Sequence, residues 1–200
     1  NRTLQVAGAD EKVKILYHFL GLGVEHILTG FDHLAFLLAL LLVLLLVPDG
    51  IARDGLRTIT AFTVAHSITL LLAAFGVLRL PSYWVESAIA LSIVVVALGN
   101  LRRRPPRARW LVTFAFGLIH GLGFASVLGG SSLPRDTVVG SVVCFNLGVE
   151  LGQLGVLLAL LPLLRWLRRR EERLRRRIVD VASVILAVIG VGWMVVRLGG

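Results

Sequence analysis

Two histidines and two carboxylates lie close together where the first hydrophobic block of the sequence begins. They are Glu25, His26, Asp32 and His33, and an uncharged apolar run, residues 34–47, follows them directly. Glu25 and Asp32 are seven residues apart, as are His26 and His33. At about 100° per residue, seven steps return to nearly the same face of a helix. Imidazole together with carboxylate suits zinc, nickel, cobalt or iron better than calcium. The spacing therefore predicts a polar stripe on one helix that can bind a transition metal.

The composition predicts that these residues lie inside a membrane. Of the 200 residues, 56% are hydrophobic and the mean hydropathy is +0.85, which is too apolar for a soluble domain of this size. Each apolar block reaches the length of about 20 residues that crosses the hydrocarbon core. We therefore expect an all-α polytopic integral membrane protein, a single transmembrane domain over residues 1–200 with six transmembrane helices. Their expected spans are about 15–47, 56–77, 83–101, 109–128, 136–166 and 178–198.

The positive charges predict the orientation. The loops after the first, third and fifth expected helices hold two, five and eight arginines, which is 15 of the 21 Lys and Arg residues. By the positive-inside rule these loops face the cytoplasm, so both termini are expected outside. Arginines between hydrophobic blocks also contact anionic lipid. Despite the net charge of +9 we therefore expect the lipid bilayer as a partner, and no nucleic acid.

Two classes of site are excluded by the sequence itself. The single cysteine, Cys144, rules out an internal disulfide and a cysteine-based metal site. No nucleotide-binding motif is present, so this chain is not expected to bind or hydrolyse a nucleotide. The polar start without an initiator Met leaves open whether a signal peptide or an upstream domain precedes Asn1.

Further polar side chains lie within the other expected helices. His66 lies near the middle of the second helix, Glu86 near the outer end of the third and His120 in the fourth; Asn146 and Glu150 share one face of the fifth. Ionisable groups at such depths usually face a protein interior or a cavity. We expect these side chains to converge on one zone that opens outward and binds a divalent Ni, Co or Zn ion. The expected metal ligands are His26, Asp32, His33, His66, His120 and Glu150, with Glu25, Glu86 and Asn146 as a possible outer entry.

Helix geometry limits how one ion can be held by the first helix. At a rise of 1.5 Å per residue, His26 and His33 are roughly 10 Å apart along a continuous helix. One ion then cannot bind to both histidines unless the helix breaks at Gly30. Two stacked positions, or an entry position above a deeper one, fit this spacing better, and we expect one of these arrangements.

Some of the polar and small residues have a purely structural interpretation. An intramembrane amide or hydroxyl more often joins two helices by a hydrogen bond than binds a metal, and small residues four apart allow helices to pack closely. The last expected helix has no charge between Asp180 and Arg197, which indicates a scaffold helix. Glu25 and Glu86 can simply lie at the outer interface. We expect such structural roles for Thr69, Asn100, Gly117, Gly121 and Gln153, and an interfacial position for His18.

Five motifs taken together resemble the HupE/UreJ family of small bacterial membrane proteins. His-x5-Asp-His is matched by His26, Asp32 and His33, and FTVAHSITL, VESAIALS, FGLIHGLGFA and FNLGVELGQ resemble a second, more divergent branch of that family. The resemblance covers residues 23–153. Ile27 stands where the better-known branch often has proline, and only His120 stands where that branch has a histidine-rich pattern. The resemblance implies a nickel or cobalt permease of the bacterial cytoplasmic membrane, associated with hydrogenase and urease systems.

Functions of different classes could use these residues. A metal carrier would capture an ion outside and hold it at mid-membrane, where transporters usually bind their substrate. The alternative is an intramembrane zinc-dependent hydrolase, with three histidines and a carboxylate on the metal and Glu150 or Asp32 as general base. A structural or sensor protein with a polar core is the third option. We favour the carrier because the ligands lie at two depths along the first helix. The metal, the direction of flux and the oligomeric state are left open.

Overall fold

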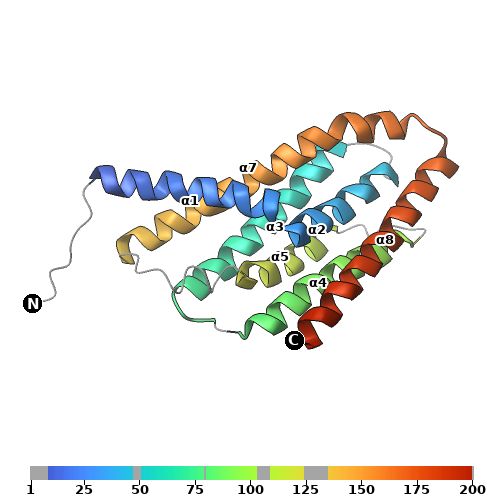
Figure 1. Cartoon of the computed structure of the whole chain (residues 1–200). Helices are drawn as coiled ribbons and strands as arrows, with labels where there is room; N and C mark the ends of the chain where they lie inside the picture. Colours follow the sequence, from blue (N-terminus) through green and yellow to red (C-terminus); the bar gives the residue numbers. More distant parts are fainter. Residues whose placement is uncertain (1–8, 47–50, 79, 103–108, 124–134, 200) are drawn as a thin grey trace, which may run out of the picture.

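The computed structural model describes residues 9–46, 51–78, 80–102, 109–123 and 135–199, and these residues form helices without any strand among them (Figure 1). The all-α fold expected from the hydrophobic blocks is therefore confirmed. In chain order the elements are α1 (Ala9–Thr29), α2 (Phe31–Leu42), the 3₁₀ helix η1 (Val43–Leu46), α3 (Ile51–Ala74), α4 (Ser82–Asn100), α5 (Arg109–Gly123), α7 (Arg135–Arg168) and α8 (Glu172–Gly199).

Four of these helices, α3, α4, α7 and α8, are long and apolar enough to cross a membrane. α1 and the α2–η1 segment pass the same test only together, as a bent pair. If this pair is counted as one span, the total rises to five. The described part of α5 has 15 residues, and the end of the expected fourth span, residues 124–128, lies outside the described residues. The chain is thus a membrane protein with four or five candidate spans among the described residues, and a total of six stays a prediction.

The first expected span is broken at Gly30. α1 and α2 meet there at an angle of 69°, and Gly30 has the extended backbone of a helix N-cap, with φ −77° and ψ 92°. The ordinary helix bonds continue on both sides, from Gly30 N–H to the carbonyl of His26 and from Leu34 N–H to the carbonyl of Gly30, each at 3.0 Å. A Cβ atom at Gly30 would lie 2.5 Å from the oxygen of His26, so the bend requires glycine for close approach. The expectation of two stacked positions along a continuous helix is therefore wrong, because the helix breaks at Gly30.

The bundle is built from helix pairs that meet at glycines. α1 packs parallel to α7 where Gly23 meets Gly148, and a Cβ atom on either glycine would overlap the backbone of the other helix. α3 packs parallel to α5 through Gly117 and Gly121, which confirms the packing role expected for these two residues. α4 packs antiparallel to α8 at Gly190. Close backbone approach of this kind is a main source of helix association in lipid.

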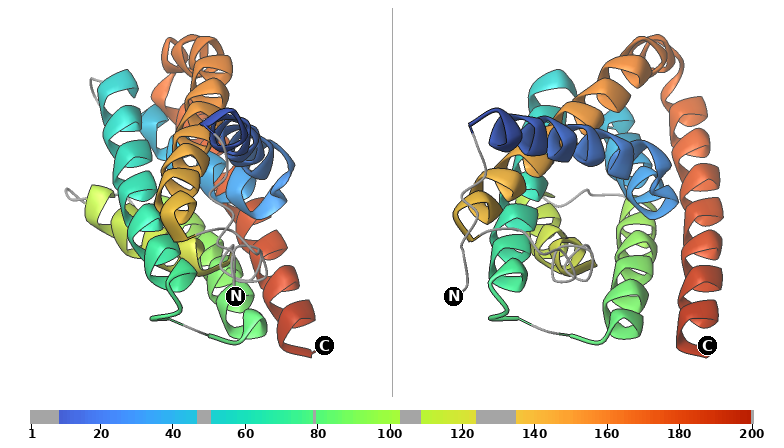
Figure 2. Two further views of the ribbon diagram at one scale, coloured as in Figure 1. Left: turned by 90° about the vertical axis from the view of Figure 1, so that its left-hand side faces the viewer. Right: turned by 60° about the vertical axis from the view of Figure 1, so that its left-hand side comes forward.

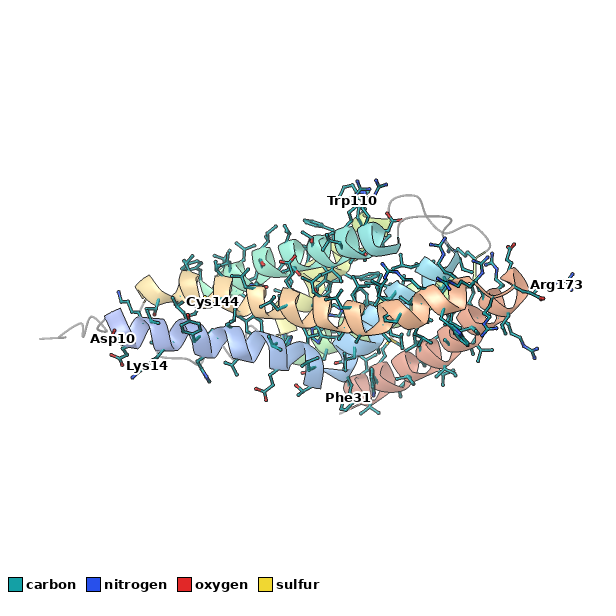
Figure 3. The ribbon with its side chains drawn as sticks, turned by 90° about the horizontal axis from the view of Figure 1, so that it is seen from above. Asp10, Lys14, Phe31, Trp110, Cys144 and Arg173 are labelled. Carbon is teal, nitrogen blue, oxygen red and sulfur yellow. The ribbon has the colours of Figure 1, made fainter. Side chains whose placement is uncertain are left out.

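The outside of the bundle is apolar and the basic segment lies at one end. Figure 2 shows α4 and α8 side by side at one edge, so the opposite face of α8 is open, and its valines Val188 and Val196 are well exposed. Such an apolar surface suits contact with lipid tails, whereas in water it would make the protein associate with other molecules. Figure 3 shows Arg173, in the first turn of α8, at the end opposite Asp10 in the first turn of α1. The arginine-rich segment at this end joins α7 to α8 by a tight turn after Arg168, and Nη1 of Arg175 donates to the carbonyl of Arg168 at 3.2 Å.

Candidate metal centre

Four of the five histidines meet inside the bundle, and His33 lies at their centre. The centroid of its ring is 4.4 Å from that of His26 and 5.0 Å from that of His120. The ring of His66 is 6.5 Å from His33 and 6.2 Å from His26. His18, the fifth histidine, is exposed on α1. The structure thus brings together the four histidines that the sequence analysis selected as ligands.

Four different helices position these rings. His26 lies in the last turn of α1 and His33 in the first turn of α2, so the bend at Gly30 turns one ring onto the other. His66 and His120 come from α3 and α5, which are held together one residue after His120, where Gly121 lies against the backbone of His66. The cluster therefore forms where a broken helix meets a tightly packed helix pair.

Three phenylalanines enclose the four histidines. Phe62 stacks on His66 with ring centroids 5.7 Å apart, and Phe145 stacks on the same ring at 6.4 Å. Phe36 and Phe62 lie 4.7 Å and 5.1 Å from His120. All three phenylalanines are at most 2% exposed, as are His66 and His120. His66 and His120 are therefore shielded from water, so each of their ring nitrogens must find a protein partner or a ligand, or stay unsatisfied at a cost.

Several ring nitrogens of the cluster have no hydrogen-bond partner among the residues that the structure describes. These atoms are Nε2 of His33, both nitrogens of His66 and Nδ1 of His120. A buried polar atom without a partner costs about 1–3 kcal/mol. Four such atoms lie in one small volume, and each of them is a good ligand for a transition metal.

The spacing of the rings suits two or three imidazoles that share one ion. Metal–nitrogen bonds of about 2 Å place the ring centroids of two imidazoles on a tetrahedral ion about 5 Å apart. The distances from His33 to His26 and His120 bracket this value. In the described part of the chain no three His, Cys, Asp or Glu side chains are already arranged to hold an ion. The rings of His33, His26 and His120 lie edge to face, so ligation needs rotation of side chains that are already in reach.

Asp32 is engaged by α8. Its Oδ2 accepts a hydrogen bond from Nη2 of Arg197 at 2.6 Å. Arg197 also donates through Nη1 to the carbonyl of Glu86 at 3.0 Å, and its Nε lies 3.7 Å from the Glu86 carboxylate. Adjacent residues on a helix point about 100° apart, so Asp32 and His33 do not face the same point. The ligand role expected for Asp32 stays a prediction that this ion pair does not support, and α8, expected as a scaffold, contributes a charged group.

Glu150 lies along the contact between α7 and α3. Oγ1 of Thr60 donates to its Oε1 at 3.2 Å, and one turn further on Oγ1 of Thr63 donates to Oε1 of Gln153 at 3.1 Å. Thr60 precedes His66 by six residues, which is about 9 Å along α3. Glu150 therefore lies on the same helix pair as the cluster but at another level, and its ligand role also stays a prediction. Gln153 joins two helices, as expected.

The three residues expected at an outer entry differ in their surroundings. Glu25 and Glu86 are exposed, and Glu86 shares Arg197 with Asp32. Asn146 is buried beside Phe145, and its Nδ2 donates to the carbonyl of Val142 within α7 at 2.9 Å. The two carboxylates are thus accessible to a cation from outside the bundle, whereas Asn146 is not.

Some residues of the site were missed by the sequence analysis. Phe62 lies four residues before His66, so the two share a helix face, and this spacing was a usable signal. Ser92, which lies 3.0 Å from Nε2 of His120, stands in the motif VESAIALS but had no spacing that linked it to a histidine. The sequence did not indicate that Arg197 would pair with Asp32 either, because 165 residues separate the two.

A family model described as HupE / UreJ protein matches residues 3–197, which is nearly the whole chain. No curated protein and no solved structure matches the chain. The chain therefore belongs to the HupE/UreJ family, a family associated with nickel and cobalt transport. The match confirms the resemblance seen in the motifs and extends it to the last helix, which holds Arg197.

Proposed function

We propose that this HupE/UreJ protein is a permease for Ni²⁺ or Co²⁺ that binds its cargo ion between the rings of His26, His33, His66 and His120 inside the membrane. One observation carries the proposal: the bend at Gly30 and the α3–α5 contact bring four imidazoles together at a point where ring nitrogens of His33, His66 and His120 have no partner in the described residues. Neutral imidazole suits nickel, cobalt and zinc.

The cluster has the features of a transient binding position. A permease must bind its ion strongly enough to admit it and weakly enough to release it. Four neutral imidazoles supply ligands but no negative charge, so a bound dication stays only partly compensated. Two carboxylates adjoin these histidines in the sequence; Asp32 is already paired with Arg197, and Glu25 is exposed on α1. The membrane potential supplies a driving force of about 2.3 kcal/mol per charge for each 100 mV, which acts twice on a divalent cation.

The broken helix supports the same function. Transporters commonly bind substrate near the bilayer midplane at discontinuous helices, because a helix break frees the backbone and brings side chains from two directions to one point. α1 and α2 make such a break between two of the four histidines. A change in the bend angle would separate His26 from His33, which gives the protein a way to release the ion.

The zinc-dependent hydrolase remains the alternative, and two contacts count against it. A general base for a metal-bound water must lie within hydrogen-bond reach of that water. Asp32 is held by Arg197 at 2.6 Å, and Glu150 accepts from Thr60 at another level of α3. Neither carboxylate has the position that the hydrolase requires, so we favour the carrier.

Metal flux into proteoliposomes tests the proposal. The purified protein should carry Ni²⁺ or Co²⁺ into vesicles that enclose a metal-sensitive dye, faster with an inside-negative potential, and more slowly as the pH falls, because protonated imidazole cannot bind a metal. His33→Ala should abolish the flux, whereas the matched control His18→Ala, on the exposed face of α1, should leave it unchanged. Equal flux in the wild type and in His33→Ala would overturn the proposal.

A further inference from the structure

Ser92 on α4 makes two contacts through one hydroxyl group. The side chain is fully buried, and its Oγ lies 2.6 Å from the carbonyl oxygen of Ile89 and 3.0 Å from Nε2 of His120. A carbonyl oxygen only accepts hydrogen bonds, and a serine hydroxyl has one proton to give. The proton therefore goes to Ile89, and the oxygen of Ser92 accepts its second hydrogen bond from His120.

This pattern assigns the tautomer of His120. A neutral imidazole has its proton on one ring nitrogen and a lone pair on the other. Donation to Ser92 requires the proton on Nε2, which leaves the lone pair on Nδ1. Nδ1 is buried and has no hydrogen-bond partner in the described part of the chain. Only the nitrogen with the lone pair can bind a metal ion.

We infer that Ser92 is a positioning residue that holds His120 in the Nε2–H tautomer, so that Nδ1 of His120 is the atom that binds the cargo ion. The inference rests on the proposed function and names a ligand atom within that site. Histidines that bind metals usually donate their second N–H to an oxygen acceptor, and loss of this acceptor weakens metal affinity about 10- to 100-fold.

The packing of α4 fixes the acceptor. Asn100, at the end of the helix, donates through Nδ2 to the carbonyl of Ala39 in α2 at 2.8 Å. The hydrogen bond of Ser92 to Ile89 locks the hydroxyl onto its own helix, so the lone pairs of Oγ are directed toward α5. Ser92 thus presents an acceptor to Nε2 of His120.

Ser87 offers a matched control on the same helix. It is a buried serine five residues before Ser92, and its hydroxyl has no hydrogen-bond partner among the described residues. Ser87→Ala and Ser92→Ala therefore remove the same buried atom from the same helix, and they differ in the two contacts that only Ser92 makes, with His120 and with the carbonyl of its own helix at Ile89.

Two measurements on full-length protein in nanodiscs test the inference. Nitrogen NMR of ¹⁵N-histidine-labelled protein reports which ring nitrogen is protonated, with the signal of His120 assigned by its loss in His120→Gln. Titration with Co²⁺, followed by its visible absorption, reports affinity. We expect Nε2–H at His120 in the wild type and in Ser87→Ala. In Ser92→Ala we expect loss of this preference and cobalt binding weakened about 10- to 100-fold.

The outcomes separate this inference from the proposed function. A wild-type His120 protonated on Nδ1 overturns the inference, as does Ser92→Ala with an unchanged tautomer and unchanged cobalt affinity. Equal weakening in Ser87→Ala also overturns it, because the effect would then come from helix packing. If the wild type binds neither Co²⁺ nor Ni²⁺, the proposed function fails, and the tautomer of His120 in Ser92→Ala alone decides whether Ser92 controls it.

Discussion

At the scale of single residues, the buried histidines are expected to lower the stability of the protein while they provide ligands for a metal ion. His66 is fully buried between Phe62 and Phe145, and neither of its ring nitrogens has a partner among the described residues. A leucine at this position would fill a similar volume without an unsatisfied polar atom. We therefore expect His66→Leu to raise the free energy of unfolding by about 1–3 kcal/mol, while it lowers the affinity for Co²⁺. Unfolding in SDS and cobalt titration measure the two effects.

The control for this substitution is His18→Leu. His18 is exposed on α1 and its ring contacts only the neighbouring Phe19 among the ring contacts of the described residues, so neither stability nor cobalt affinity should change. A His66→Leu protein that is less stable than the wild type and still binds cobalt with full affinity would show that His66 is a structural residue of the core.

At the scale of elements, the bend between α1 and α2 determines whether His26 and His33 meet. A Cβ atom at Gly30 would approach the carbonyl of His26 to 2.5 Å and Nδ1 of His33 to 3.0 Å, so alanine must change the bend or move the His33 ring. We expect Gly30→Ala to weaken cobalt binding about tenfold or more, which is the size of effect seen when a metal-binding histidine loses its orientation. Gly21→Ala is the control, because nothing lies within 4 Å of a Cβ atom there. Unchanged cobalt affinity in Gly30→Ala would contradict a role of the bend in ligation.

The ion pair between Asp32 and Arg197 ties the start of α2 to the end of α8. The two side chains are 22% and 21% exposed, so the pair is only partly screened by solvent. Arg197→Gln leaves a half-buried carboxylate uncompensated and should cost roughly 1–3 kcal/mol of stability. Asp32→Asn in the same protein should recover part of this loss. Arg177→Gln, which removes the same charge from an exposed position in the same helix, should cost little. Additive effects of Asp32→Asn and Arg197→Gln in a double-mutant cycle would exclude a direct interaction.

The lengths of the apolar runs predict where the helices lie. They do not predict how each helix is rotated about its own axis, and this rotation decides which way a side chain points. The expected span 83–101 and the observed Ser82–Asn100 nearly coincide, because turn-forming residues follow the apolar runs. His33, His66 and His120 could be grouped from depth alone, whereas His26 joins them only because the helix breaks at Gly30. Asp32 could not, since its direction depends on the rotation of α2 after Gly30. The direction of Glu150 depends in the same way on the α1–α7 contact at Gly148. Depth along a helix is encoded locally, whereas rotation about its axis is set by the neighbouring helices.

At the scale of the whole molecule, the orientation in the membrane follows from charge. The turn between α7 and α8 is rich in arginine, so by the positive-inside rule we predict that it lies in the cytoplasm and that the start of α4 lies outside. In a protein whose Cys144 is replaced by alanine, a cysteine at Ser82 should react with a membrane-impermeant maleimide in intact cells. A cysteine at Arg170 should react only after the cells are opened. Labelling of Arg170→Cys in intact cells would contradict the predicted orientation.

The central claim is that one transition-metal ion binds among the four histidines, and X-ray absorption at the cobalt edge tests it most directly. The protein loaded with one equivalent of Co²⁺ should show a first shell with two or three imidazoles, recognised by the outer-shell scattering of their rings, with metal–nitrogen distances of about 2.0–2.1 Å. His33→Ala should reduce the number of imidazoles or lose the ion. A first shell made only of oxygen, unchanged by His33→Ala, would place the ion at carboxylates or water and contradict the histidine site.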